Sequence, residues 1–348
     1  MTKIKFIIAI AAIAITSACK KNSPTSEVTP PPVVVSPPAT TNDVYAVGYT
    51  QPASATRQVA SLWKNGAFTQ LTDGSAIATA TSVFVLGNDV YVGGNDNLKA
   101  RIWKNGVAIN LPDKGFSGYV NAIYVVGADV YAAGGVTTTI SGGISNACMW
   151  KNGALIILDD INNSNASGIF VNGTDVYVCG RTTDSQLIKT SVLWKNGVKT
   201  KLSDGTDAGA TGVFVSGNDV YVSGTIAGKI VNNVTTYSKA VVWKNGTAIT
   251  LSDGSSGGVE ASSVFVNGQD VYVAGSFPNA NIWKNGVATP IVEANASSSA
   301  QCIFVLGSDV YLGGDRNSTA SYFKNGVRVQ LTQNPPLGSS MVKGIFVK

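Results

Sequence analysis

The sequence predicts an all-β fold, a seven-bladed β-propeller built from four-stranded antiparallel blades. Three observations support this prediction. One unit of about 44 residues recurs along the chain, its short apolar segments are separated by tight turns, and the two chain ends supply complementary parts of one unit. The composition agrees, since the chain has 38 glycines and only 13% charged residues, which favours strands joined by turns over helices.

Two sequence markers define the repeat and number its copies. The tetrapeptide Trp-Lys-Asn-Gly begins at Trp63, Trp103, Trp150, Trp194, Trp243 and Trp283, and Phe323 opens a seventh copy. The tripeptide Asp-Val-Tyr begins at Asp43, Asp89, Asp129, Asp175, Asp219, Asp270 and Asp309. Both markers therefore indicate seven units, and a tryptophan in nearly every copy indicates a wedge packed between blades.

Residues 82–111 show one complete unit, in which four short apolar segments are separated by turns. The last turn is Asn105-Gly106, the strongest short hairpin signal, because both residues tolerate positive φ. The inner segments read Val-Phe-Val and Val-Tyr-Val without polar alternation, so both of their faces must be covered, as in blades stacked on neighbours. The slot before the first triplet is always small, which suits a crowded central axis, and is occupied by Ser82, Ala122, Gly168, Gly212, Ser263, Cys302 and Gly344.

The chain ends predict how the ring closes. The repeats start at Asp43 with a second strand that has no first strand before it, and they end at Gly344–Val347 with a first strand that nothing follows. The C-terminal strand must therefore join the first blade, beside residues 43–71. Closure of this kind leaves no unpaired edge at either end of the array.

The segment Val-Tyr-Val-Gly-Gly at 90–94, followed by an aromatic strand, resembles kelch-type repeats, and residues 43–348 as a whole resemble a seven-bladed propeller array. The spacing after the glycine pair and the Trp-Lys-Asn-Gly ending differ from the kelch pattern. The resemblance implies the fold and carries no activity with it.

The first 18 residues have the features of an export signal. Lys3 and Lys5 precede the apolar run Phe6–Ile15, and the small residues Thr16–Ala18 lead into Cys19. This arrangement resembles the lipobox of bacterial lipoproteins, which implies that residues 1–18 are removed and that Cys19 becomes the acylated N-terminus. The alternative is ordinary cleavage that leaves Cys19 unmodified.

Residues 19–42 are predicted to form the lipidated cysteine and a disordered tether, because residues 20–42 contain six prolines and no apolar periodicity. A Pro-rich spacer extends by about 3.1 Å per residue, or roughly 70 Å here, and would lift a domain at 43–348 off the membrane. By analogy with lipoprotein sorting, Lys20 after the cysteine favours the outer membrane. Whether the domain faces the periplasm or the cell surface stays open.

Several functional classes are excluded or disfavoured by composition. The chain has no histidine, which removes Ser-His-Asp and Cys-His catalysis and histidine-ligated zinc. Cys148, Cys179 and Cys302 lack a C-x-x-C spacing. Cys179 and Cys302 fit small buried positions, Cys148 lies at a variable third-strand position, and Cys148–Cys179 is the one pair worth testing for a disulfide. The net charge of +5 is spread thinly, which argues against nucleic acid. We predict no cofactor, no metal and a monomer.

Loop variation suggests where a site would lie. In antiparallel blades, the second-to-third loops and the blade-to-blade crossings share one face, and here these segments vary while the opposite turns are nearly identical. The same variation is expected from unconstrained drift. The side chains on this face that could grip a polar ligand are Tyr49, Arg57, Asp96, Arg181, Asp184, Tyr237, Asp315 and Arg316.

Acidic residues are candidates for metal ligands or catalysts. The seven Asp-Val-Tyr carboxylates could surround a cation. All of them except Asp43 follow Gly-x in a tight turn, where Asp commonly accepts a backbone N–H, so a structural role is predicted. The pair Asp159-Asp160 lies at a crossing, and a glycosidase needs two carboxylates at a defined separation. No residue is assigned as catalytic.

The sequence therefore favours a membrane-tethered binding or scaffolding module for a protein or glycan at the cell envelope. One alternative is a carbohydrate-active enzyme, a lyase or hydrolase, with a carboxylate or tyrosine site in the funnel of the variable face. Another is a structural component of an envelope complex.

Overall fold

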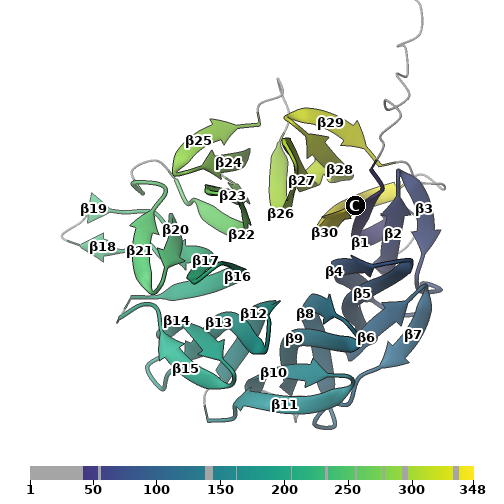
Figure 1. The fold of residues 1–348 in the computed structure, drawn as a ribbon, viewed down its shortest axis with the longest axis horizontal. Coiled ribbons are helices and arrows are strands. Elements are labelled where there is room, and N and C mark those ends of the chain that lie inside the picture. The colour runs from purple at the N-terminus through teal and green to yellow at the C-terminus, as the bar shows by residue number, and fades with distance from the viewer. Residues whose placement is uncertain are drawn as a thin grey trace, which may run out of the picture. The chain divides into compact units, whose positions relative to one another are not determined.

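Seven four-stranded antiparallel sheets surround a central axis, with the first strand of each sheet innermost (Figure 1). This confirms the predicted seven-bladed β-propeller. The computed structural model describes residues 42–348 except 54–55, 138–143, 162, 205, 232–233, 255–256, 277–278, 292–296 and 332–336. The predicted signal peptide at 1–18, the lipidation site at Cys19 and the tether through residue 41 lie outside the described residues.

Blades 1 to 4 have the following strands. Blade 1 contains β30 (Leu337–Val347), β1 (Val44–Pro52), β2 (Val59–Lys64) and β3 (Ala67–Gln70). Blade 2 contains β4 (Ala78–Leu86), β5 (Asp89–Asp96), β6 (Lys99–Lys104) and β7 (Val107–Asn110). Blade 3 contains β8 (Ser117–Val126), β9 (Asp129–Thr137), β10 (Ser145–Lys151) and β11 (Ala154–Asp159). Blade 4 contains β12 (Asn163–Asn172), β13 (Asp175–Thr183), β14 (Lys189–Lys195) and β15 (Val198–Lys201).

Blades 5 to 7 repeat the pattern, with one insertion. Blade 5 contains β16 (Ala208–Ser216), β17 (Asp219–Ile226), β20 (Lys239–Lys244) and β21 (Thr247–Thr250), and its second-to-third loop carries the hairpin β18 (Ile230–Val231) and β19 (Val234–Thr235). Blade 6 contains β22 (Glu260–Asn267), β23 (Asp270–Ser276), β24 (Ala280–Lys284) and β25 (Val287–Pro290). Blade 7 contains β26 (Ser298–Leu306), β27 (Asp309–Arg316), β28 (Thr319–Lys324) and β29 (Val327–Gln330).

The Asn-Gly hairpins form as predicted. Asn105 and Gly106 have φ of 51° and 83°, the two successive positive values that a type I′ turn requires. The six other Asn-Gly pairs repeat this geometry, with asparagine φ between 50° and 51°. These turns join the third and fourth strands on one face, which we call the floor face.

The small slot on the first strand is set by the approach of neighbouring blades. A Cβ added at Gly168 would lie 3.0 Å from the Cα of Gly212 in the next blade, and one at Gly344 would lie 2.9 Å from the Cα of Ser82. Distances this short leave no room for larger side chains where seven inner strands meet. The predicted crowding at the axis is therefore confirmed.

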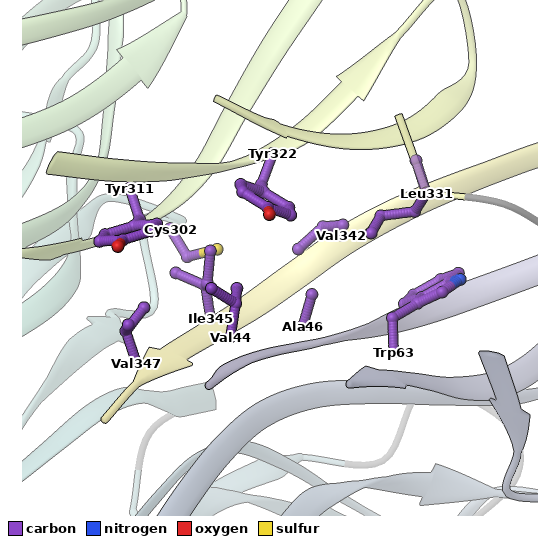
Figure 2. Packing of buried hydrophobic residues seen from close by; sticks show 11 residues of the cluster. Val44, Ala46, Trp63, Cys302, Tyr311, Tyr322, Leu331, Val342, Ile345 and Val347 are labelled. Atoms are coloured by element: carbon purple, nitrogen blue, oxygen red, sulfur yellow. The ribbon is translucent and has the colours of Figure 1, made fainter. Parts of the chain in front are cut away.

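The tryptophan side chains pack between neighbouring blades. Trp63 and its six counterparts, including Phe323, are at most 2% exposed. Trp63 of blade 1 packs in one cluster with Tyr311 and Tyr322 of blade 7 (Figure 2). Each such cluster spans two blades, so the hydrophobic core is a set of interfaces between sheets rather than one central mass.

The ring closes where the chain ends meet. β30 pairs antiparallel with β1 from Val44↔Val347 to Pro52↔Leu337, and the backbones of Asp43 and Lys348 exchange two hydrogen bonds of 2.8 and 3.0 Å. Figure 2 shows β30 and β1 side by side beneath blade 7. This arrangement is the predicted closure, in which the last strand completes the first blade.

The floor face carries one polar cluster in every blade. In blade 5, Asn245 Nδ2 donates to Asp219 Oδ1 at 2.8 Å, and Lys244 Nζ lies 2.7 Å from Asp219 Oδ2. Asn245 Oδ1 also accepts the backbone N–H of Val220 at 2.8 Å, and Lys244 Nζ lies 5.3 Å from the ring centroid of Tyr221. We call this arrangement the Asp–Asn–Lys cluster.

All seven blades repeat the Asp–Asn–Lys cluster, with Asn–Asp distances of 2.7 to 2.8 Å and Lys–Asp distances of 2.7 to 3.0 Å. The marker aspartates are thus structural, as predicted, but their observed partners are side chains rather than backbone N–H groups. The asparagine side chain, not the aspartate, bonds the backbone. The cluster explains why Asp-Val-Tyr and Lys-Asn-Gly recur together.

We predict that deleting residues 343–348 destabilises the whole domain. The deletion removes Ile345 and Val347, which are 7% and 2% exposed, and burial of each contributes about 1.5–3 kcal/mol. A loss of roughly 4 kcal/mol corresponds to a fall in Tm of about 10 °C for a domain of this size. Thermal melts followed by circular dichroism measure the shift.

The control for this deletion replaces residues 230–235 by two glycines, because β18 and β19 form a separate two-stranded sheet. This change should leave Tm nearly unaltered. An unchanged Tm in the 343–348 deletion would contradict the role of β30 in closure.

We predict that the Asp–Asn–Lys clusters make stability fall in acid. Hydrogen bonds from Lys244 and then Asn245 lower the pKa of Asp219, and the six equivalent aspartates are shifted the same way. A lowered folded-state pKa gives stability that is present above the unfolded value of about 3.9 and is lost as pH falls through the folded value.

Thermal melts of the wild type and Asp219→Asn between pH 2 and pH 8 test this. The variant should melt lower at pH 7 and converge on the wild type in acid, whereas Asp160→Asn, at an exposed carboxylate outside the clusters, should follow the wild type throughout. A constant difference between Asp219→Asn and the wild type at every pH would count against the clusters.

Candidate functional site

A β-bulge turns one polar side chain of each blade toward the central channel. In blade 2, Ala80 pairs with Gly94 and Ser82 with Gly93, so Thr81 is the extra residue. A Cβ at Gly94 would clash with the carbonyl oxygen of Thr79, which explains the glycine that lies opposite the bulge on each second strand. The residues at this position, which we call the bulge residues, are Thr81, Asn121, Ser167, Thr211, Ser262, Gln301 and Lys343.

An aromatic ring from each blade lines the channel on the floor side of the bulge residues. We call these seven rings the aromatic collar, formed by Phe84, Tyr124, Phe170, Phe214, Phe265, Phe304 and Phe346. Neighbouring centroids lie 4.8 to 5.1 Å apart around a closed circle. The bulge residues and the collar together line a cavity of about 260 Å³.

Some bulge residues join neighbouring blades. Thr81 Oγ1 donates to the carbonyl oxygen of Val120 at 2.7 Å, and Asn121 Nδ2 donates to that of Ala166 at 2.7 Å. Thr211 Oγ1 makes the equivalent bond to Ala261 at 2.8 Å. These three side chains therefore stabilise the ring.

Two adjoining cavities hollow the variable face over blades 3 to 6. The first, of about 390 Å³, extends from Lys189 and Asp207 to Glu260. The second, of about 440 Å³, lies over blades 3 and 4 and is bordered by Tyr119 and Leu187. Arg181 and Lys189 line both cavities, and the first shares Ser167 and Thr211 with the channel cavity. We call the two cavities together the Arg181 hollow, and it opens onto the central channel.

Arg181 supplies an available positive charge in this hollow. It is exposed on β13, opposite Asn165 of the first strand, and no carboxylate of the described residues forms an ion pair with it. Lys189 lies 3.7 Å from Asp207, a long and exposed pair. Glu260 lines the first cavity and is also exposed. The hollow thus offers a bidentate cation together with two acids.

Polar groups and one loop shape the second cavity. The Tyr119 hydroxyl accepts a hydrogen bond from Asn165 Nδ2 at 2.9 Å and lies 3.3 Å from Ser145 Oγ. Leu187 is 78% exposed with φ of 64°, a conformation rare for a residue of this size. Asp184 Oδ1 accepts the N–H groups of Gln186 and Ile188, both at 2.9 Å, and so holds the loop in this shape.

The structure distributes the predicted ligand-binding residues over the variable face. Arg181 lines the hollow, and Asp184 shapes the loop beside it. Arg57 donates to the carbonyl oxygen of Ser75, and Asp96 pairs with Arg101 at 3.1 Å. All of these assignments as ligand contacts remain predictions.

A second group of predicted residues lines neither cavity of the hollow. Asp315 is buried and accepts hydrogen bonds from Ser299 Oγ and from the backbone N–H of Ser318. Burial, with a smaller contribution from the charge of Asp315, raises the pKa of Tyr49. Arg316 follows Asp315 at the end of β27, and Tyr237 is 44% exposed in the loop that follows the β18–β19 hairpin. The structure therefore does not gather all eight residues into one site.

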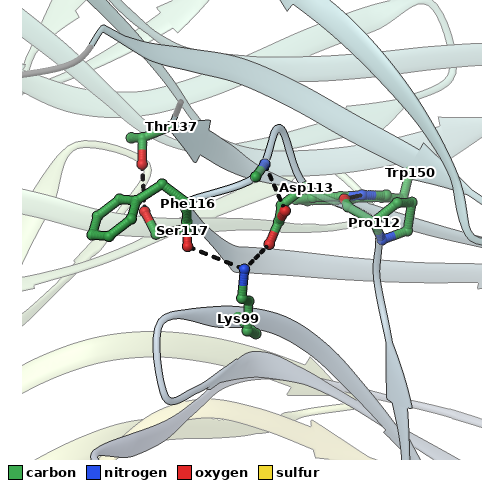
Figure 3. A network of polar contacts seen from close by, with 8 residues as sticks. Lys99, Pro112, Asp113, Phe116, Ser117, Thr137 and Trp150 are labelled. Carbon is green, nitrogen blue, oxygen red and sulfur yellow. Dashed lines mark hydrogen bonds and ion pairs between the residues drawn. The ribbon is translucent and has the colours of Figure 1, made fainter. Parts of the chain in front are cut away.

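The crossing between blades 2 and 3 is fixed by a polar network (Figure 3). Lys99 Nζ donates to Asp113 Oδ2 at 2.7 Å and to the carbonyl oxygen of Phe116 at 3.1 Å. Trp150 Nε1 donates to the carbonyl oxygen of Pro112 at 2.8 Å. The charged groups of this part of the variable face are bonded to each other and to the backbone. They are therefore less available to a ligand than the charged groups of the Arg181 hollow.

Other candidate groups have structural surroundings. Asp159 is buried and lies 2.6 Å from Lys199 Nζ, so the Asp159-Asp160 pair does not present two open carboxylates. Cys148, Cys179 and Cys302 are buried free thiols, and burial raises the pKa of Cys179 to about 12. Within the described ranges, no cluster of His, Cys, Asp or Glu could hold a metal ion. In the same part of the chain, no helix has the length and hydropathy to cross a membrane.

The bulge residues and the two acids of the hollow are not among the site residues that the sequence predicts. The bulge residues lie three positions before the aromatic of each Val-Phe-Val triplet, and a polar residue at that spacing was the available signal. Lys343 is the charged member of this set. Asp207 and Glu260 have no recurring pattern, because each lies in a segment that differs between blades.

Comparison with known proteins supports the fold and no family. No protein-family model and no curated protein matches this chain, so the kelch-like character of the repeat stays a prediction. A puromycin hydrolase mutant superposes with a TM-score of 0.56 at 9% identity over 84% of this chain and 53% of that one.

Two further solved structures give similar values. A Mycobacterium tuberculosis puromycin-hydrolyzing peptidase has a TM-score of 0.52 at 12% identity, over 85% of this chain and 53% of that chain. The Pyrococcus horikoshii acylaminoacyl peptidase has a TM-score of 0.51 at 13% identity, over 84% and 51%. This chain spans about half the length of these proteins, and the low identities show a shared fold alone.

Proposed function

We propose that this propeller is a binding module whose Arg181 hollow takes a glycan carrying acidic groups. The observation that carries the proposal is the position of Arg181, where two cavities meet and no carboxylate of the described residues neutralises it. A guanidinium in such a position favours a carboxylate or a similar planar anion on the ligand.

The rest of the hollow supports a polar ligand. Its walls carry hydroxyl and amide groups from Ser145, Asn163, Thr183, Thr225 and Ser238. Such groups exchange hydrogen bonds with sugar hydroxyls, and the volumes of about 390 and 440 Å³ lie within the range of ligand sites. A protein partner is the second candidate ligand, since exposed Leu187 and Ile161 lie on the same face.

Glycan cleavage is a second candidate function, because the first cavity contains both Asp207 and Glu260. A glycosidase uses two carboxylates, and a lyase could use Tyr119 with Arg181 in the adjoining cavity. The chain has no histidine, so any such chemistry would depend on these residue types. Binding is preferred because Asp207 faces Lys189 and the Tyr119 hydroxyl contacts Asn165.

We predict that Arg181→Ala weakens binding of an acidic glycan at least about tenfold, through loss of a charge-assisted bidentate contact. The full chain in detergent would be screened on an array of neutral and acidic glycans, and affinities for the bound glycan then measured by calorimetry. Lys201→Ala is the control, because it removes an exposed positive charge on β15 outside both cavities.

Equal affinity in Arg181→Ala and the wild type would reject the Arg181 hollow as the binding site. Binding to a protein alone, if it is lost in Arg181→Ala, would favour the protein ligand. Release of shortened glycan by the wild type and not by Glu260→Gln would favour the enzyme.

The proposed module acts at the cell envelope on a lipid anchor. The lipobox-like segment before Cys19 and the Pro-rich residues 20–42 support a propeller held away from the outer membrane, facing either the periplasm or the cell surface. A tether of this kind would leave the variable face free to meet a ligand.

We predict that Cys19→Ser removes fatty-acid labelling and releases the chain from the membrane fraction, because a serine cannot carry the thioether-linked lipid. Metabolic labelling and membrane fractionation measure the two effects, and Cys148→Ser, at a buried thiol, is the control. Retention of label in Cys19→Ser would exclude this anchor.

A further inference from the structure

The ring of bulge residues is asymmetric in its hydrogen bonding. In blades 2 to 5, the side chains of Thr81, Asn121, Ser167 and Thr211 donate to other groups of the protein. The next three around the ring differ. In the described structure Ser262 Oγ and Gln301 Nε2 donate to no protein group, and Lys343 Nζ donates to Gln301 Oε1 alone. Blades 6, 7 and 1 thus present an arc of available donors to the channel.

Lys343 supplies the charge of this arc. Among the described residues that line the channel cavity, Lys343 is the one that carries a charge. Its Nζ donates to Gln301 Oε1 at 3.3 Å, which leaves two of its three protons. No carboxylate of the described residues lies within ion-pair distance of it.

The surroundings of Lys343 disfavour an unpaired ammonium. Desolvation by burial lowers the pKa of Lys343, while the thiol of Cys302 and the carboxylate of Asp315 raise it by less. Asp315 is already bonded to Ser299 and Ser318. Lys343 is half-buried, and a partly desolvated cation without a hydrogen-bonded counter-charge is unfavourable, so an anion in the cavity would stabilise it.

We propose that the central channel binds a small oxyanion, a carboxylate or phosphate group, on Lys343 with Gln301 and Ser262 as further donors. The three residues are bulge residues of adjacent blades, so their side chains enter the channel from the same side. A rigid bulge holds each of them, and a charged donor beside neutral donors is typical of oxyanion binding.

The anion would enter from the variable face. On the floor side, the aromatic collar forms a closed ring that offers no hydrogen-bond donor except the Tyr124 hydroxyl. On the other side, the first cavity of the Arg181 hollow shares Ser167 and Thr211 with the channel. This site is separate from Arg181 and does not depend on the proposed glycan.

Calorimetric titration of the full chain with inorganic phosphate, and separately with acetate, tests the proposal. We expect saturable binding of at least one anion to the wild type and an affinity at least about tenfold weaker in Lys343→Met, which loses the charged donor. Lys201→Met is the matched control, because it removes the same charge from an exposed position on β15. The affinity of Lys201→Met for the anion should equal that of the wild type.

A second pair of variants guards against a folding defect, because Lys343 lies in the closing strand. Gln301 and Ser262 lie on strands other than β30. Gln301→Leu and Ser262→Ala should each lower the affinity for the anion several-fold. The bound anion should also raise Tm in the wild type and Lys201→Met, since a ligand of the folded state stabilises it, but not in Lys343→Met.

The outcomes separate this site from the Arg181 hollow. Absence of saturable binding to the wild type at millimolar phosphate and acetate would overturn the proposal. Equal affinity in Lys343→Met and the wild type would overturn it as well. Loss of anion binding in Arg181→Ala with retention in Lys343→Met would place the anion in the hollow and leave the proposed function standing.

Discussion

The close approach of seven inner strands at one axis is the constraint on which the rest of this structure depends. The strands meet so tightly that a Cβ at Gly168 would lie 3.0 Å from the Cα of Gly212. Each first strand accommodates the approach with a bulge, and a glycine opposite the bulge on the second strand leaves room for it. The small residues, the glycines and the channel-facing polar groups are therefore consequences of one packing requirement.

The features that could be predicted from the sequence are those that every blade needs equally. Asn105-Gly106 is a turn signal with a physical cause, since both residues adopt positive φ, and it recurs because every third strand must reverse. Trp63 and its counterparts recur because every interface between blades needs a large wedge. Closure followed from matching incomplete units at the chain ends. Repetition therefore made the fold predictable without any relative.

The candidate site was less predictable because it depends on departures from the repeat. Arg181 was identified as a cation on a variable loop, but its place between two cavities required the positions of blades 3 to 6. Residue type alone favours Asp184 and Arg57, but Asp184 accepts hydrogen bonds within its own loop and Arg57 donates to a backbone carbonyl. A list of polar residue types cannot separate groups satisfied within the protein from groups that are available to a ligand.

Lys343 shows how closure and binding can meet in one strand. β30 closes the ring through backbone pairing with β1 that does not depend on the identity of its bulge residue. That residue is therefore free to differ from the threonines and serines that occupy several other blades, and here it is a lysine beside Gln301. A sevenfold ring of equivalent positions would treat all sides of the channel alike. One charged side chain and two neighbouring donors break that equivalence, so an anion would have a preferred side of the channel even though the backbone has none.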